Sequence, residues 1–371
     1  MNGATGEPEP YQSPLRDKAF SLYLDLWRSF AALVVVMAHL RQDGFQLPIT
    51  FAGKFAHEAV IVFFVLSGLV IAHSTLSNAR GWREYLAARA GRLFAVIVPA
   101  TLLGIACAAV IGPGEWSDRI VSRAEWSPAE ILLGWTFLSR SWLIDADLPL
   151  NEPFWSLCYE AWYYTLFGVF LFMRGKARIA ALCAGAMIAG PAILILSPAW
   201  LAGVWLYRRA TSVTVPMPRL VAIGCIAAIA AIGFSGLPPL LRATMSGIVP
   251  EWYVLRDATN VFTDLAIALL FSLHLLAART LVPAGILRFE RHVRFAAGGT
   301  FTLYLMHRPL TYLLSGDGFA VLHGPLMSLA TLIGIVTFAL LLSRSLERNL
   351  TDWLRRRILA ALGSPQGAIA R

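Results

Sequence analysis

Long apolar runs separated by short polar segments dominate the chain. Runs of spanning length lie at about 24–40, 59–76, 93–111, 154–173, 178–196, 219–236, 259–278, 299–314 and 325–343. Because a helix of about 20 residues crosses the hydrocarbon core of a bilayer, each run predicts a transmembrane helix. With a marginal run at about 198–208, the pattern predicts an all-α, polytopic membrane helix bundle of about ten transmembrane helices.

Composition supports a membrane protein. Of the 371 residues, 57% are hydrophobic and 14% charged, whereas soluble domains carry about 25% charged residues. The net charge of +9 comes from basic residues that cluster in particular loops, which favours membrane topology over nucleic-acid binding. The four cysteines lie in or beside apolar segments without metal-ligand spacing, so we expect neither a metal site nor a disulfide framework.

The basic segments indicate the topology. They are 77–92, which includes Arg80, then 174–178, 208–209, 279–294 and the tail from 344. All five fall on the cytoplasmic side if both termini are cytoplasmic and segment 129–142 does not cross. The opposite loops, 112–128 with Glu115 and Asp118, and 315–323, carry fewer cations. We expect a cytoplasmic tail over 1–22 with no cleaved signal peptide, a transmembrane domain over 23–343 and a cytoplasmic tail over 344–371.

The first span carries two polar residues, Arg28 and His39. Eleven residues return a helix to within about 20° of the same direction, about 16 Å further along its axis. Charged side chains inside a bilayer usually face a bundle interior or a water-filled cavity. We therefore expect Arg28 and His39 to line one polar cavity. The alternative is that each residue only marks one end of the span.

Later segments add four candidate residues. Arg89 and Arg92 share a helical face and suit phosphate, since guanidinium forks form bidentate hydrogen bonds; as an alternative, they are anchors that obey the positive-inside rule. Glu160 lies two turns into a span, where a carboxylate needs a partner or a cavity, and we expect it to face the cavity of Arg28. His307 lies inside a late apolar run, where a structural, hydrogen-bonded histidine is the alternative.

Five motifs occur in order along the chain. They are arginine and histidine eleven apart in the first span, Phe63-Phe64-Val65-Leu66-Ser67-Gly68, the Arg89/Arg92 pair, Trp155-Ser156-Leu157-Cys158-Tyr159-Glu160, and Leu303-Tyr304-Leu305-Met306-His307-Arg308-Pro309. In this order, from about residue 20 to 343, they resemble the acyltransferase 3 family of bacterial inner-membrane O-acyltransferases. Ser67 and Gly68 are also small residues that favour close helix packing.

The resemblance implies an enzyme that transfers acyl groups other than aminoacyl groups, in the bacterial inner membrane. It implies acyl-CoA as donor, which we expect to be acetyl-CoA, and O-acetylation of a saccharide or lipid-linked glycan as in polysaccharide modification. It makes His39 the candidate catalytic base with Arg28 in its motif, assigns Arg89 and Arg92 to acyl-CoA, and matches Glu160 and His307 to the polar positions of the later motifs.

This chemistry is physically consistent. A thioester is already activated, while a hydroxyl needs a general base near neutral pH, and histidine has a suitable intrinsic pKa. A nearby cation, Arg28 or another group, would stabilise the oxyanion. Two other functions are alternatives. A transporter or flippase for a lipid-linked glycan or an anion would use the same buried polar residues to bind without chemistry. A scaffold of an envelope complex is the other, and no specific sequence feature supports it. The order of the motifs favours the acyltransferase.

Overall fold

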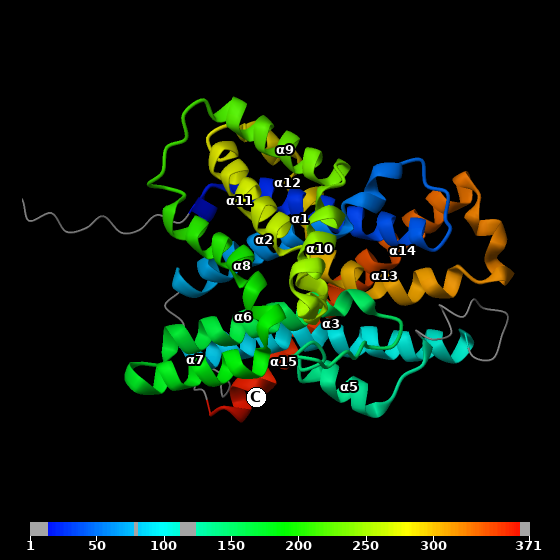
Figure 1. Ribbon diagram of the computed structural model, residues 1–371, viewed down its shortest axis with the longest axis horizontal. Coiled ribbons are helices and arrows are strands. Elements are labelled where there is room, and N and C mark those ends of the chain that lie inside the picture. Colours follow the sequence, from blue (N-terminus) through cyan, green and yellow to red (C-terminus); the bar gives the residue numbers. More distant parts are fainter. Residues whose placement is uncertain (1–13, 78–80, 112–123, 364–371) are drawn as a thin grey trace, which may run out of the picture.

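The computed structural model describes residues 14–77, 81–111 and 124–363, and the regular elements in these ranges are helices (Figure 1). The long helices are α1 (Lys18–Gln42), α2 (Ala56–Leu76), α3 (Trp82–Ile111), α6 (Trp155–Phe172), α7 (Gly175–Ala189), α8 (Pro191–Arg209), α9 (Pro218–Phe234), α11 (Val261–Ala278), α13 (Thr300–Leu314) and α14 (Pro325–Ser343). Shorter helices are α5 (Pro128–Trp135), α10 (Leu237–Ile248), α12 (Glu290–Gly298) and α15 (Thr351–Ala361). Single turns and short links are η1 (Pro14–Arg16), η2 (Thr50–Lys54), η3 (Glu152–Phe154), η4 (Pro250–Ala258), η5 (Ala284–Phe289), η6 (Asp317–His323) and η7 (Arg344–Leu350).

The predicted polytopic, all-α architecture is confirmed. Six helices among the described residues are long and apolar enough to cross a membrane, or seven if the bent pair α9–α10 counts as one span. Helices α7 and α13 have 15 residues each, fewer than the roughly 20 of a perpendicular span. The expected number of about ten spans therefore stays a prediction.

Two segments clarify the path of the chain. The helix in segment 129–142 is the eight-residue α5, which begins at Pro128 after a Ser127–Glu130 capping box. At 1.5 Å per residue this helix is too short to cross a bilayer. The prediction of one helix over 178–196 is wrong. The chain breaks at Gly190, whose φ of +87° suits glycine, and Pro191 begins α8, which absorbs the marginal run at 198–208.

Much of the predicted C-terminal tail is helical. Element η7 and helix α15 continue from α14, and α15 packs on α3 so closely that a Cβ on Gly91 would lie 3.2 Å from the backbone of Thr351 and Arg355. Glu347 accepts hydrogen bonds from the backbone and hydroxyl of Thr302, at 2.8 and 2.7 Å. The tail therefore helps to anchor α13. Residues 1–13, Arg80, Glu115, Asp118 and residues 364–371 lie outside the described residues.

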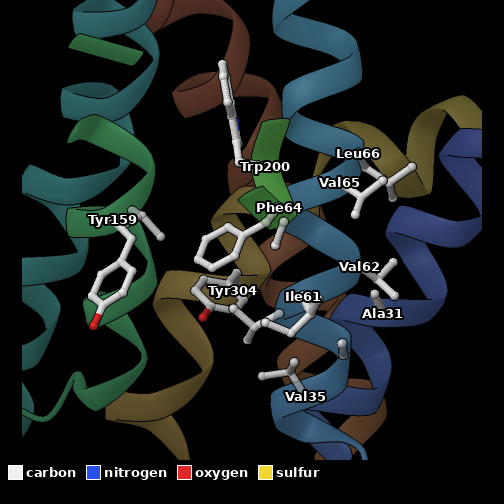
Figure 2. Close-up of a cluster of buried hydrophobic side chains, with 14 of the residues drawn as sticks. Ala31, Val35, Ile61, Val62, Phe64, Val65, Leu66, Tyr159, Trp200 and Tyr304 are labelled. Atoms are coloured by element: carbon white, nitrogen blue, oxygen red, sulfur yellow. The ribbon is translucent and has the colours of Figure 1, made fainter. Parts of the chain in front are cut away.

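Helix α2 packs closely on α8. A Cβ on Gly68 would lie 2.0 Å from the carbonyl oxygen of Trp200, and one on Gly203 would lie 2.0 Å from that of Val65. The predicted close-packing role of Gly68 is thus confirmed. On another face of α2, Phe64 points toward α6, where its ring stacks on Tyr159 at 6.4 Å between centroids (Figure 2).

Candidate active site

One cavity lies among α1, α2, α3, α6 and α13 and is rich in arginine. We call it the arginine cavity. Its charged lining residues are Arg28, Arg89, Arg92 and Glu160. Glu160 thus lines the same cavity as Arg28, as the sequence predicts. Three guanidinium groups face one carboxylate, an excess of positive charge that favours an anionic ligand.

The arginine side chains are held by neighbouring helices. Arg89 donates from Nη2 to the Ser74 hydroxyl at 2.9 Å, which ties α3 to α2. Arg28 lies 3.5 Å from Thr300 Oγ1 on α13 and 3.5 Å from a carboxylate oxygen of Asp25. Both of the Arg28 contacts are long for hydrogen bonds, so little reorganisation is needed for its guanidinium to turn toward an anion.

A second cavity contains His39 and His57. We call it the histidine cavity. Its other charged lining residues are Arg140, Asp145, Asp147, Glu152, Arg256 and Asp257. Four carboxylates face two guanidinium groups here, so the excess charge is opposite in sign to that of the arginine cavity. Trp155 provides a broad aromatic wall.

Arg140 organises the acidic wall of the histidine cavity. It pairs with Asp145 and Asp147 and lies 3.7 Å from Asp257. Burial opposes the charge of Arg140, but Asp147 and Asp257 outweigh that effect and raise its pKa above the ordinary value. The guanidinium thus stays charged and holds the carboxylates at the cavity surface.

The two cavities adjoin at Val60 and Tyr304, which line both. The Tyr304 hydroxyl donates to the carbonyl of Pro153 at 3.1 Å and lies 2.8 Å from the Ser156 hydroxyl. Arg28 and His39 thus share a stripe of α1 but line two adjoining cavities, and whether the two act as one polar cavity stays a prediction.

His39 forms a pair with His307. His39 Nδ1 lies 2.8 Å from His307 Nε2, and His307 Nδ1 lies 3.0 Å from the carbonyl oxygen of Leu303. A carbonyl only accepts, so in neutral His307 the proton is on Nδ1 and Nε2 is an acceptor. His39 must then donate from Nδ1, which leaves the lone pair of neutral His39 on Nε2. His307 is fully buried and lines neither cavity.

Arg308 joins the two helices that carry this histidine pair. It is fully buried and donates to Glu152 at 2.9 and 3.0 Å, to the Tyr312 hydroxyl at 2.6 Å, and to Asp43. Asp43 follows directly on the last turn of α1. The ion pair therefore ties the end of α1, near His39, to α13, which carries His307.

Pro309 leaves a carbonyl of α13 without its usual partner. A proline has no N–H, so the carbonyl four residues earlier, that of Leu305, loses a helical hydrogen bond. Asn151 donates its side-chain amide to that carbonyl at 3.0 Å. The segment before α6 is thereby pinned to α13 beside the histidine cavity.

Sequence reasoning missed several functional-site candidates. Tyr304 and Arg308 stand inside the quoted late motif, and Glu152 lies three residues before the Trp155 motif, but the sequence alone assigns none of them a role. Asp264 lies in an apolar run, a position that by itself signals a partner or a function; the structure places it 2.9 Å from His57. The Arg140 cluster gave no sequence signal because its carboxylates come from loops.

Comparison with known proteins gives one match. A family model described as an acyltransferase domain matches residues 21–344, which is most of the chain. No match was found among curated proteins or among solved structures.

Proposed function

Because the chain belongs to the acyltransferase 3 family and is an acyltransferase, we propose that it moves an acetyl group from acetyl-CoA to a hydroxyl of a saccharide or glycoconjugate. The observation that carries this proposal is a pair of adjoining cavities of opposite charge, with His39 in one and the arginines in the other. An anionic donor and an uncharged acceptor can then approach one junction from two sides.

The donor binds in the arginine cavity. Arg89 and Arg92 contact the phosphates of coenzyme A, and their planar forks suit phosphate oxygens. Arg28, whose present contacts are long, turns to the donor or to charge that develops on it. The arginine cavity therefore faces the cytoplasm of a bacterial inner membrane, which agrees with the positive-inside rule.

The acceptor binds in the histidine cavity. Carboxylates and an aromatic wall suit a sugar, because carboxylates accept hydrogen bonds from hydroxyls and an indole packs on the apolar face of a ring. Trp155 and the acidic group around Arg140 supply both features. A lipid-linked glycan fits the same scheme when its saccharide enters from the outer side.

His39 is the general base of the reaction. Its Nε2 takes the proton from the acceptor hydroxyl as the oxygen bonds to the thioester carbonyl carbon. The tetrahedral intermediate then collapses, the carbon–sulfur bond breaks, and the thiolate of coenzyme A recovers the proton. His307 acts as a positioning residue, because its hydrogen bond selects the tautomer of His39 that carries the lone pair on Nε2.

The test uses purified protein with labelled acetyl-CoA and a panel of saccharides. We expect the label in an O-acetyl ester of a saccharide, with release of free coenzyme A. If the label stays on coenzyme A while a lipid-linked glycan crosses vesicles that contain the protein, the proposal fails and a transporter is supported.

A further inference from the structure

A second histidine of the histidine cavity, His57, is not part of any motif that the family resemblance assigns. His57 lies in the first turn of α2, and its Nε2 lies 2.9 Å from Asp264 Oδ1 on α11. The His57 side chain is 27% exposed, whereas that of Asp264 is 1% exposed. The imidazole thus reaches the cavity while its partner lies entirely within the protein.

Asp264 depends on His57 for its charge balance. Its second oxygen, Oδ2, is buried and has no hydrogen-bond partner among the described residues. A buried carboxylate without a cationic partner is costly. The contact therefore stabilises the protonated imidazolium of His57, in which Nδ1 also carries a hydrogen. No hydrogen bond to that Nδ1 is found in the described part of the chain.

The two histidines of this cavity have hydrogen-bond partners that favour different protonation states. His39 is bonded to a neutral imidazole, that of His307, whereas His57 is bonded to a carboxylate. When two titratable groups have environments that favour different protonation states, they are suited to act as base and acid in one reaction. Here His39 is suited to accept a proton and His57 to donate a hydrogen bond.

His57 also lies near the place where the acyl group must react. It precedes Val60 by three residues on α2, which is about one helical turn from the junction of the two cavities. Its ring stacks on Trp155, with centroids 5.9 Å apart. The next residue after Trp155 is Ser156, which contacts the Tyr304 hydroxyl at 2.8 Å. Asp264 and Trp155 thus hold the His57 imidazole from two sides, near the junction of the two cavities.

We propose that His57 is a further catalytic residue, which donates a hydrogen bond from Nδ1 to the oxyanion of the tetrahedral intermediate, with Asp264 as its positioning residue. This inference rests on the proposed acyl transfer. As the acceptor oxygen bonds to the carbonyl carbon, the π electrons move to the carbonyl oxygen and His39 takes the hydroxyl proton. When the intermediate collapses, sulfur leaves with the electron pair of the carbon–sulfur bond, and His57 keeps its proton throughout.

The test measures kcat and the KM for acetyl-CoA in four variants. His57→Gln keeps a donor but no positive charge, and Asp264→Asn keeps a hydrogen-bonding side chain without the charge. The double variant His57→Phe with Asp264→Leu keeps an aromatic ring beside Trp155 and leaves no buried carboxylate unpaired. His73→Gln, at the other end of α2 and outside both cavities, is the matched control.

Loss of one oxyanion donor typically lowers kcat by about 10²–10³. We expect that loss in the double variant, a loss of about tenfold in each single variant, and an unchanged KM for acetyl-CoA because the arginine cavity is intact. The control should retain the wild-type kcat. If the folded double variant keeps kcat within about twofold of the wild type, or if only KM changes, His57 has a structural role and this inference is overturned. If the wild-type protein forms no acyl ester, both the proposed function and this inference are overturned.

Discussion

Replacement of His307 tests whether it sets the tautomer of His39. In His307→Leu the acceptor at 2.8 Å from His39 Nδ1 is lost. An unsatisfied buried donor costs about 1–3 kcal/mol, which favours the tautomer that places the lone pair on Nδ1. Because about 1.36 kcal/mol corresponds to a tenfold change in rate, we expect kcat to fall by about 5- to 150-fold.

Steady-state initial rates of acyl transfer provide the assay. The KM for acetyl-CoA should stay unchanged, since His307 lines neither cavity. His307→Gln serves as the matched variant, because its amide oxygen can still accept from His39, and it should recover most of the lost rate. A folded His307→Leu protein with wild-type kcat would refute the reasoning. Equal losses in the two variants would show that His307 contributes only through packing.

Three further predictions address the donor site, the packing and the topology. Arg89→Ala and Arg92→Ala should each weaken acetyl-CoA binding in a titration, with Lys giving partial rescue because it lacks the planar fork; unchanged binding in the double variant would leave these residues as topology anchors. Gly68→Leu should destabilise the protein by at least about 1–3 kcal/mol, since even a Cβ would lie 2.0 Å from a carbonyl oxygen, and a thermal shift equal to zero would contradict the tight α2–α8 contact. Reporter proteins fused after residues 176 and 290 should both be located in the cytoplasm. An external location at either position would refute the topology.

Much of the helical architecture is predictable because its signals are local. Hydrophobic runs appear directly in the sequence, and an arginine, a histidine or a glutamate within such a run is conspicuous. The break at Gly190 was missed because the apolar run continues across it, and hydrophobicity alone does not report the positive φ of one glycine. The helical C-terminal tail was missed for the opposite reason: α15 is polar, and its contact with α3 is a tertiary one.

The site was only partly predictable because its geometry depends on distant segments. The spacing of Arg28 and His39 correctly places both on one stripe of α1, but it contains no information about Tyr304, which comes from α13 and stands between the two cavities. The hydrogen bond from His39 to His307 joins residues 268 positions apart. Such pairings arise from packing, and a single sequence shows only that each partner is polar in an apolar run.

The most direct test of the account is the rate of acyl transfer by His39→Gln. Glutamine keeps a polar side chain of similar bulk but is not a base, and a positioned base contributes about 10²–10⁴ in rate. We therefore predict that His39→Gln inserts into the membrane and binds acetyl-CoA as the wild type does, but loses transfer by at least about 10². Transfer at a near wild-type rate would contradict the account, because His39 would then be structural and Glu160 would become the candidate base.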